Sequence, residues 1–345
     1  MIPFPLLSLL ENSLLFLAAG AVITLAGVKL TALADRLADV TRLGEAITGA
    51  LLLGASTSLA GIVVSVTAAG SGHAEMAVSN AVGGIAAQTF FIALADFTYR
   101  RANLEHAAAS YANLVHGTTL MALLCLPLLA HAAPAVDVFG VHPVTPVLVV
   151  AYLGGLRLAS YARDEPMWRP KQTVETREDV PAELPGTIGS VVALGGRYGV
   201  LAIIVAGAGF VVARTGLAIA DETGLDAGLI GAVLTGVVTS APELVTTLAA
   251  VRRGALTLAV GGILGGNAFD VLFLALADTA YRPGSIYHAM TGAQVFLIVL
   301  AMLMTTALLL GLLRRETHGI ANVGFESALI MALYAGGLVI LILAW

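Results

Sequence analysis

The sequence contains two copies of one segment, and the second copy follows the first at a constant offset that pairs Gly54 with Gly236. Residues 54–100 read GASTSLAGIVVSVTAAGSGHAEMAVSNAVGGIAAQTFFIALADFTYR, and residues 236–282 read GVVTSAPELVTTLAAVRRGALTLAVGGILGGNAFDVLFLALADTAYR. The two stretches align without a gap, and 18 of the 47 paired positions carry the same residue. This pairing, the repeat register, extends back to Asp39 and Asp221, so the repeats cover about residues 39–100 and 221–282. The match indicates an internal duplication, which restricts the chain to folds built from two equivalent halves.

The composition places these repeats in a membrane. Of the 345 residues 58% are hydrophobic and 11% are charged, whereas soluble domains carry about 25% charged residues. A helix that spans a bilayer needs about 20 largely apolar residues. Ten such segments lie near residues 14–35, 45–70, 76–98, 108–131, 140–160, 195–219, 226–250, 256–279, 287–312 and 321–344. We therefore expect an all-α integral membrane protein with about ten transmembrane helices.

A polar stretch rich in proline and charge, residues 161–186, divides the ten segments into two groups of five. It is typical of a linker, so we expect an N-terminal half over residues 1–160 and a C-terminal half over residues 187–345. Because five is an odd number, the two halves must enter the membrane in opposite directions. The sequence thus predicts inverted-topology repeats, the plan of many secondary transporters; duplication kept only for architecture is the alternative.

The basic residues predict the orientation in the membrane. When the connections are assigned alternately to the two faces, one face receives only Arg214 and Arg282. The other face receives Lys29, Arg36, Arg42, Arg100, Arg101, Arg157, Arg163, Arg169, Lys171, Arg177, Arg197, Arg252, Arg253, Arg314 and Arg315. Basic residues accumulate on the cytoplasmic side. We expect a plasma-membrane protein with a cytoplasmic linker, both termini outside and an uncleaved N-terminus.

The second repeat places a carboxylate and a proline in the middle of an apolar segment. A charge such as that of Glu243 costs at least a few kcal/mol at this depth, so a function or a partner must offset it. Pro242 removes a backbone donor and is expected to disrupt the helix there. The freed carbonyls, the Glu243 carboxylate and the hydroxyls of Thr239 and Ser240 form a set of hard oxygen ligands, which suit Na⁺, Ca²⁺ or a proton.

A second polar pair follows in GGILGGNAFDVLF. Asn267 and Asp270 are three residues apart and share a helix face, and Asp270 is also in the middle of its segment. Glu243 and Asp270 are therefore expected to form a cation site on adjacent helices. The alternative is a pair of hydrogen-bonded, neutral carboxylic acids in the core.

These two segments resemble the α-repeat of the calcium/cation antiporter superfamily, the sodium/calcium exchanger-like proteins. The pattern of that family is a small-Thr-Ser-x-Pro-Glu segment followed by Gly-Ser-Asn-x-x-Asp or Asn, and the sequence TSAPELVTTLAA followed by GGILGGNAFDVLF is similar to it. The resemblance implies ten helices in two inverted halves and counter-transport of Ca²⁺ or another cation against Na⁺ or H⁺ by alternating access. The ion ligands that it implies are Thr239, Ser240, Glu243, Asp270, Thr57, Ser58 and Gln88.

The first repeat departs from that pattern. Gly61 stands at the position of Glu243, Ala60 at that of Pro242, and Gln88 at that of Asp270, so both predicted charges come from the second half. Two charges still balance one Ca²⁺, but fewer fixed oxygens favour a monovalent ion or a proton. We interpret Glu75, at the turn between two segments, as an entrance or solvated charge and not as a replacement ligand.

Other polar residues in the segments are given structural roles. His116 is interpreted as a hydrogen-bonded interfacial histidine in preference to a proton relay. Asp96 and Asp278, at matching helix ends, are interpreted as interface anchors and not as ligands. The single cysteine, Cys125, is expected to be a small core residue.

The function that follows is a secondary cation antiporter whose partners are membrane lipid and inorganic cations. The transported Ca²⁺, Na⁺ or H⁺ are substrates, and we expect no organic cofactor, no nucleotide and no nucleic acid. Because no P-loop is present, we do not expect ATP-driven pumping. The alternatives are a monovalent Na⁺/H⁺ exchanger and a degenerate, non-transporting cation-binding protein. An intramembrane hydrolase that uses Glu243 and Asp270 finds no support in a His-Glu-x-x-His or Gly-x-Ser-x-Gly pattern.

Overall fold

The computed structural model describes residues 7–41, 47–99, 102–136, 138–164, 166, 168–171, 173, 188–319 and 324–345. Eight helices in these ranges are long and apolar enough to cross a membrane, and two bent helix pairs bring the number to ten. The predicted all-α membrane fold is thereby confirmed. The predicted linker, residues 161–186, lies largely outside the described residues, and the last helix of the first half reaches into it as far as Asp164.

The first half consists of α1 (Leu9–Thr41), α2 (Ile47–Thr57), α3 (Leu59–Gly70), α4 (Ala74–Thr98), the short α5 (Leu104–Ala107), α6 (Tyr111–Ala132) and α7 (Val144–Asp164). The second half consists of α8 (Ile188–Thr223), α9 (Ala227–Leu229), a π-helix (Ile230–Thr235), α10 (Gly236–Thr239), α11 (Ala241–Arg253), α12 (Leu256–Asp270), α13 (Leu272–Ala280), α14 (Gly292–Arg314) and α15 (Phe325–Ala344).

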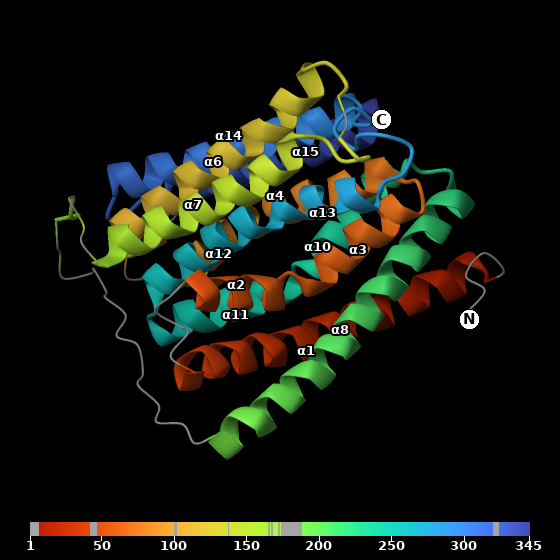
Figure 1. Ribbon diagram of the computed structural model, residues 1–345. Coiled ribbons are helices and arrows are strands. Elements are labelled where there is room, and N and C mark those ends of the chain that lie inside the picture. Colours follow the sequence, from red (N-terminus) through yellow and green to blue (C-terminus); the bar gives the residue numbers. More distant parts are fainter. Residues whose placement is uncertain are drawn as a thin grey trace.

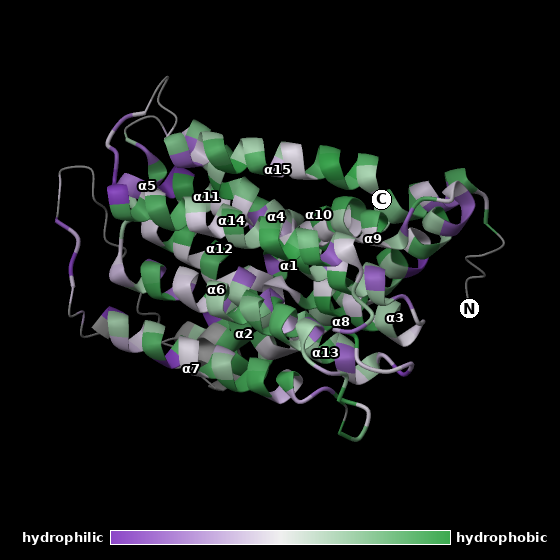
Figure 2. Ribbon diagram, turned by 90° about the horizontal axis from the view of Figure 1, so that it is seen from above, coloured by the Kyte–Doolittle hydropathy of each residue, from purple (hydrophilic) through white to green (hydrophobic). Residues whose placement is uncertain are grey.

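The helices form a layered bundle (Figure 1). α1 and α8 cross on one side of it, α6, α7, α14 and α15 lie on the opposite side, and α4, α12 and α13 run between them. The start of α1 and the end of α15 lie at one end of the bundle, whereas the end of α7 and the start of α8 lie at the other. We call the end that carries α5, the end of α7 and the start of α8 the linker face. Hydrophobic residues dominate the helices, and hydrophilic residues gather in the connections around α5 (Figure 2).

Both repeats contain the same break in the helix that follows the first span. α2 and α3 meet at 66°, and the helices on either side of Ser240 meet at 43°. The two serines at the breaks have the same backbone conformation, with φ −91° and ψ 2° at Ser58 and φ −91° and ψ 1° at Ser240. Pro242 lies in the first turn of α11, where a missing N–H costs no hydrogen bond. The helix is therefore broken next to Pro242, as expected, but the first repeat breaks at the equivalent residue without a proline, so the proline is not required for the break.

Buried aspartates confirm that the repeat continues beyond the aligned segment. Asp96 accepts a hydrogen bond from the backbone N–H of Leu104 at 2.8 Å, and Asp278 accepts one from Ile286 at 3.0 Å. In the repeat register Leu104 is equivalent to Ile286, and Asp96 is equivalent to Asp278. Both aspartates are fully buried and hold the chain that follows their helix, so they are anchors of connections within the protein.

Small residues bring α1 and α8 against the breaks of the opposite repeats. A Cβ atom at Gly27 of α1 would lie 2.8 Å from Cγ of Pro242, and one at Gly209 of α8 would lie 2.9 Å from the carbonyl oxygen of Ala60. The repeat register pairs Gly27 with Gly209, as it pairs Ala60 with Pro242. Each long helix therefore lies on the break in the other half.

One expectation about the core was wrong. Cys125 is exposed on α6 and does not belong to the core. A thiol behaves as a small apolar group, so a lipid-facing position on a membrane helix suits it as well as a core position.

The contact between α4 and the π-helix leads to a stability prediction. A Cβ at Gly83 would lie 2.5 Å from Cα and 2.8 Å from the carbonyl oxygen of Ala232, so the two backbones must separate to admit it. We expect Gly83→Ala to lower the free energy of unfolding by about 1–3 kcal/mol. The thermal midpoint of the purified protein in detergent measures this. Gly262→Ala is the matched control, because nothing lies within 4 Å of a Cβ there; equal midpoints for both variants would contradict the packing argument.

Candidate cation site

The two breaks and the helices between them enclose one buried polar pocket. Its walls come from the break between α2 and α3, from α4, from the break between α10 and α11, and from α12 and α13. The lining residues are Ser58, Gly61, Asn80, Gly84, Gln88, Thr239, Ser240, Glu243, Asp270 and Phe273. Every polar member of this set is buried. The pocket therefore lies where the inverted repeats meet, which is the usual position of a transporter's substrate site.

Asp270 is held by the first repeat. The Ser58 hydroxyl donates to its Oδ1 at 2.5 Å, and Gln88 Nε2 donates to its Oδ2 at 2.6 Å. The same Gln88 nitrogen also donates to the Ser240 hydroxyl at 3.2 Å. Gln88 and Asp270 are equivalent positions of the repeats, as are Ser58 and Ser240. The pseudo-twofold axis consequently passes between an amide and a carboxylate, which makes the site chemically asymmetric.

Glu243 projects from the first turn of α11 into the same pocket. The residue is 6% exposed, and its Oε2 atom has no hydrogen-bond partner among the described residues. Thr57 interacts with the carboxyl from the end of α2. Because a helix N-terminus favours negative charge, the first turn of α11 helps to stabilise a carboxylate at this position.

The polar groups of the pocket leave oxygen atoms without donors. Asn80 Nδ2 donates to the Gly61 carbonyl at 3.1 Å and to the Ser65 hydroxyl at 2.9 Å, so its amide hydrogens point away from the pocket. Asn80 Oδ1, Gln88 Oε1 and Glu243 Oε2 are buried without a hydrogen-bond partner in the described part of the chain. Buried polar atoms are rarely left unpaired. A set of unpaired acceptors beside two carboxyl groups has the chemistry of a hard-cation site.

An aromatic ring occupies the space next to Gly61. A Cβ at this glycine would lie 2.5 Å from Cε2 of Phe273, so α13 fills the volume into which a first-repeat side chain would project. Glu75 lies half-buried in the first turn of α4 and does not line the pocket. Among the residues that line the pocket, only Glu243 and Asp270 carry carboxyl groups.

The structure brings together six of the eight predicted site residues: Ser58, Gln88, Thr239, Ser240, Glu243 and Asp270. Thr57 is adjacent to the pocket, and its hydroxyl donates to the Gly54 carbonyl at 3.0 Å. Asn267 is not in the lining. Its Nδ2 donates to the Thr89 hydroxyl at 3.0 Å and to the Ile85 carbonyl at 3.4 Å, so it fastens α12 to α4.

The sequence analysis missed Asn80. The available signal was an amide in the middle of an apolar segment, where an unpaired polar group is costly. His116, like Asn267, does not line the pocket. Its ring lies against α12, 3.8 Å from the position that a Cβ atom at Gly265 would take.

Two inverted five-helix halves around a buried, oxygen-lined pocket define a membrane protein of the secondary-transporter class. The chain belongs to the sodium/calcium exchanger protein family, whose model matches residues 12–156 and 192–343. The two matched stretches coincide with the two halves of the fold.

Individual relatives agree with this assignment. A segment of 99 residues is 35% identical to a putative antiporter CaxA of Alkalimonas amylolytica; it covers 28% of this chain and 31% of that relative's length. Among solved structures, native YfkE superposes with a TM-score of 0.65 at 13% identity, over 96% of this chain and 91% of YfkE. The H⁺/Ca²⁺ exchanger CAX gives 0.62 at 14% identity over 96% and 88%, and the sodium–calcium exchanger NCX_Mj gives 0.56 at 18% identity over 96% and 99%. These likenesses show a shared fold.

Proposed function

We propose that this protein is a secondary antiporter that exchanges Ca²⁺ or another cation for Na⁺ or H⁺ at the pocket between its two halves. The observation that carries the proposal is the pair Glu243 and Asp270 beside unpaired acceptor oxygens. Buried carboxylates without a permanent cation must bind either a cation or protons. Competition between these two occupants for one site is the chemical basis of exchange.

Charge balance limits what one cycle carries. Two carboxylates neutralise one Ca²⁺ or two protons, so Ca²⁺/H⁺ exchange at this site leaves its charge unchanged. The ring of Phe273 beside Gly61 takes the place of a further oxygen ligand, and Ca²⁺ prefers 6–8 oxygens. This second observation favours a monovalent Na⁺/H⁺ exchanger as the alternative.

Alternating access requires a moving part. α1 and α8 lie on the breaks through Gly27 and Gly209, and a helix that carries no side chain at its contact slides with little steric resistance. We infer that this helix pair moves over the core formed by the other spans. The halves, residues 1–160 and 187–345, would then alternate in exposing the pocket.

The proposed setting is a plasma membrane with the linker face in the cytoplasm and the termini outside. The basic residues support this orientation, because all but two of those assigned to a face fall on the linker face. The proposed substrates are inorganic cations, without an organic cofactor.

Ion flux in proteoliposomes tests the proposal. Vesicles loaded with Na⁺ receive external Ca²⁺, and Ca²⁺ uptake and internal pH are followed together for the wild type, Glu243→Gln and Glu75→Gln. We expect exchange that Glu243→Gln lowers by at least about 100-fold, because a buried ligand charge contributes about 3 kcal/mol. Glu75→Gln, outside the pocket, is expected to keep the wild-type rate.

The two signals separate the alternatives. Uptake of Ca²⁺ that depends on Glu243 supports Ca²⁺ exchange, whereas a Glu243-dependent pH change without Ca²⁺ movement identifies a monovalent exchanger. Thermal stabilisation by cations without any flux in Na⁺, Ca²⁺ or H⁺ would overturn the transport proposal in favour of a non-transporting cation-binding protein.

A further inference from the structure

Three carboxyl groups meet at the linker face, away from the cation pocket. Asp96 lies near the end of α4, Glu105 lies in α5, and Glu326 lies in the first turn of α15. Their exposed fractions are 0%, 1% and 1%. We call these three residues the carboxyl cluster. Neither the cation pocket nor the proposed transport cycle uses them.

The opposite face shows how much of this cluster the fold itself requires. There Asp278 accepts hydrogen bonds from the backbone N–H of His142 at 2.8 Å and from the Thr145 hydroxyl at 2.7 Å, and Thr145 contacts the Tyr287 hydroxyl at 2.9 Å. This arrangement contains one carboxylate, and every partner named here is a neutral hydrogen-bonding group.

The linker face repeats that arrangement with different chemistry. Asp96 accepts from the backbone N–H of Gly324 at 3.3 Å, and Ser327 donates to Glu105 at 3.4 Å. In the repeat register Gly324, Ser327 and Glu105 are the equivalents of His142, Thr145 and Tyr287. Glu105 thus replaces a tyrosine, and Glu326 adds another carboxyl at the position of Val144. The fold needs one carboxylate at such an end, and the linker face holds three.

The two additional carboxyls have oxygens without hydrogen-bond partners. Glu105 Oε2 and both carboxyl oxygens of Glu326 are buried and unpaired among the described residues. Glycines leave room for the Glu326 side chain: a Cβ at Gly311 would lie 2.5 Å from its Cγ, and a Cβ at Gly324 would overlap its Oε1. The protein therefore encloses Glu326, which is 1% exposed.

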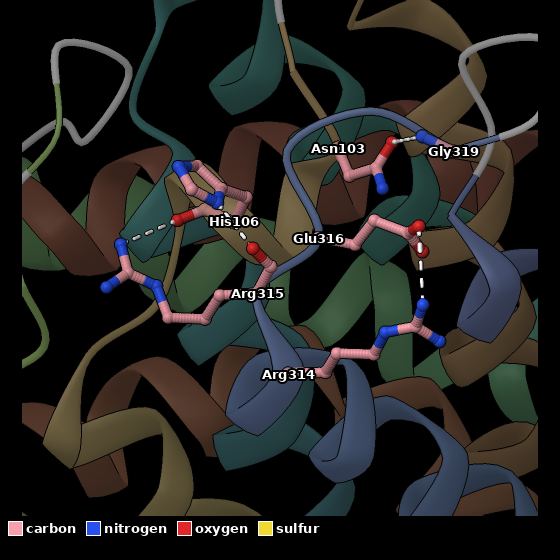
Figure 3. Close-up of polar contacts among 6 residues, drawn as sticks. All are labelled: Asn103, His106, Arg314, Arg315, Glu316 and Gly319. Carbon is pink, nitrogen blue, oxygen red and sulfur yellow. Dashed lines mark hydrogen bonds and ion pairs between the residues drawn. The ribbon is translucent and has the colours of Figure 1, made fainter.

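The cationic side chains nearby are engaged with other groups (Figure 3). Arg315 donates to the carbonyl oxygens of Lys171 at 2.7 Å and His106 at 3.3 Å. Arg314 pairs with Glu316 at 3.4 Å and lies over the Phe325 ring at 4.8 Å. The His106 ring contacts the Arg315 carbonyl at 2.7 Å and the Thr173 hydroxyl at 3.0 Å.

Among the described residues, the remaining charged neighbour is Glu316, which has the same sign as the cluster and acts on Glu326. In the described ranges, no group of three or more His, Cys, Asp or Glu side chains is arranged to hold a metal ion. The three carboxyls of the cluster therefore do not form a metal site. Burial, together with the charges of Asp96 and Glu326, raises the pKa of Glu105 well above its ordinary value of 4.5. A proton is therefore the occupant that this geometry accommodates.

We propose that Glu105 and Glu326 form a proton-binding site on the linker face, separate from the cation pocket, and that its proton holds the start of α15 and the α5 segment against the end of α4. Asp96 accepts hydrogen bonds from the backbone N–H groups of Leu104 and Gly324. When the proton leaves, two like charges face each other in a buried space and the contact loosens. α4 carries Gln88 eight residues before Asp96, about 12 Å along the helix, so the loosening reaches the cation pocket.

The sign of the pH effect follows from the raised pKa of Glu105. A group that binds its proton more tightly in the folded protein stabilises the fold fully below its unfolded pKa, and this contribution is lost as the pH rises through the folded pKa. The thermal midpoint of the wild type is therefore expected to fall as the pH rises above 4.5, the ordinary pKa of Glu105, and Glu105→Gln/Glu326→Gln is expected to shrink that fall by about half. Glu75→Gln, in the first turn of α4 at the end opposite Asp96, is the control and should keep the wild-type dependence.

The stability measurement does not depend on the proposed transport function, so its failure would count against the proton site alone. An unchanged pH dependence in the double variant would overturn the inference. If that variant does not fold, pH-induced infrared difference spectra of the wild type and the single variants provide the test. Loss of a protonated-carboxyl band in Glu105→Gln or Glu326→Gln supports the site. An unchanged band overturns the inference. A rise in the midpoint with Ca²⁺ that persists in Glu243→Gln and disappears on adding Glu326→Gln would also overturn it, in favour of a metal site.

The effect on transport rests on the proposed function and is measured separately. With the linker face made alkaline, exchange by the wild type is expected to fall by about threefold or more, and the double variant should lose less than half of that response. Loss of exchange in the wild type at every pH would refute the transport proposal and leave the stability test of the proton site standing.

Discussion

Asp270→Asn is expected to slow exchange by at least about 100-fold, since removal of one charge from a buried, paired group costs about 3–5 kcal/mol and each 1.4 kcal/mol is a factor of ten. The side chain keeps its size, so the loss reports charge. In the wild type both carboxyl oxygens accept hydrogen bonds, from Ser58 and Gln88, and an asparagine can accept through one oxygen only. Its NH₂ group would then face either Ser58 or Gln88, and the site would lose a cation ligand and gain a donor. Initial flux in proteoliposomes measures the effect.

The pseudo-twofold axis supplies a demanding control for Asp270. In the double variant Gln88→Asp/Asp270→Gln, the carboxylate moves to the equivalent position of the first repeat, where Ser240 is the counterpart of Ser58. We expect this exchange of residues to recover the flux to within about tenfold of the wild type, because the total charge and the two hydroxyl partners are retained. Recovery no better than in Asp270→Asn would show that the charge must lie on α12, and would contradict an interchangeable pair.

Gly209→Leu is expected to lower exchange by at least about tenfold while cation affinity stays within about threefold, because the substitution blocks a motion and leaves the ligands in place. Gly209 is where α8 lies on the carbonyl of Ala60, beside the break at Ser58. A leucine there meets backbone atoms, which cannot rotate away. Flux gives the rate, and cation-dependent thermal stabilisation of the same preparation gives the affinity.

Gly207→Leu is the matched control for this prediction. It lies on the same helix, two residues away, and nothing lies within 4 Å of a Cβ there. We expect wild-type exchange from this variant. Equal rates for Gly207→Leu and Gly209→Leu would mean that α8 does not slide along the first repeat.

The topology could be predicted from the sequence because two separate features of the sequence indicate it. The apolar segments gave the number of spans, and the constant offset between the repeats related the halves. The same offset relates Asp96 and its partner Leu104 to Asp278 and its partner Ile286, and the two partners lie outside the segment that was aligned. A duplication preserves contacts between equivalent residues, so the register found in one helix pair also relates the other helices of the two halves.

The composition of the site was harder to predict, and Asn80 and Asn267 show why. Both are amides in apolar spans, and only Asn267 lies in a motif, yet it is Asn80 that lines the pocket. The choice depends on where each Nδ2 finds an acceptor, which is a matter of tertiary packing. The ring of Phe273 beside Gly61 was equally hidden, because it lies on a helix that follows the motif in the other half.

The two contacts of α1 and α8 differ in one respect that bears on the resting state. Under Gly27 lies the ring of Pro242, whereas under Gly209 lies the bare backbone of Ala60. In a perfectly duplicated molecule the twofold axis would relate the inward-facing conformation to the outward-facing one, and the two would have equal free energy. If α1 and α8 slide as proposed, one sliding surface carries a ring that the other lacks, and the two conformations would be unequal in energy before any ion binds. Without a bound ion, the proposed antiporter would therefore keep its pocket open mainly to one side of the membrane.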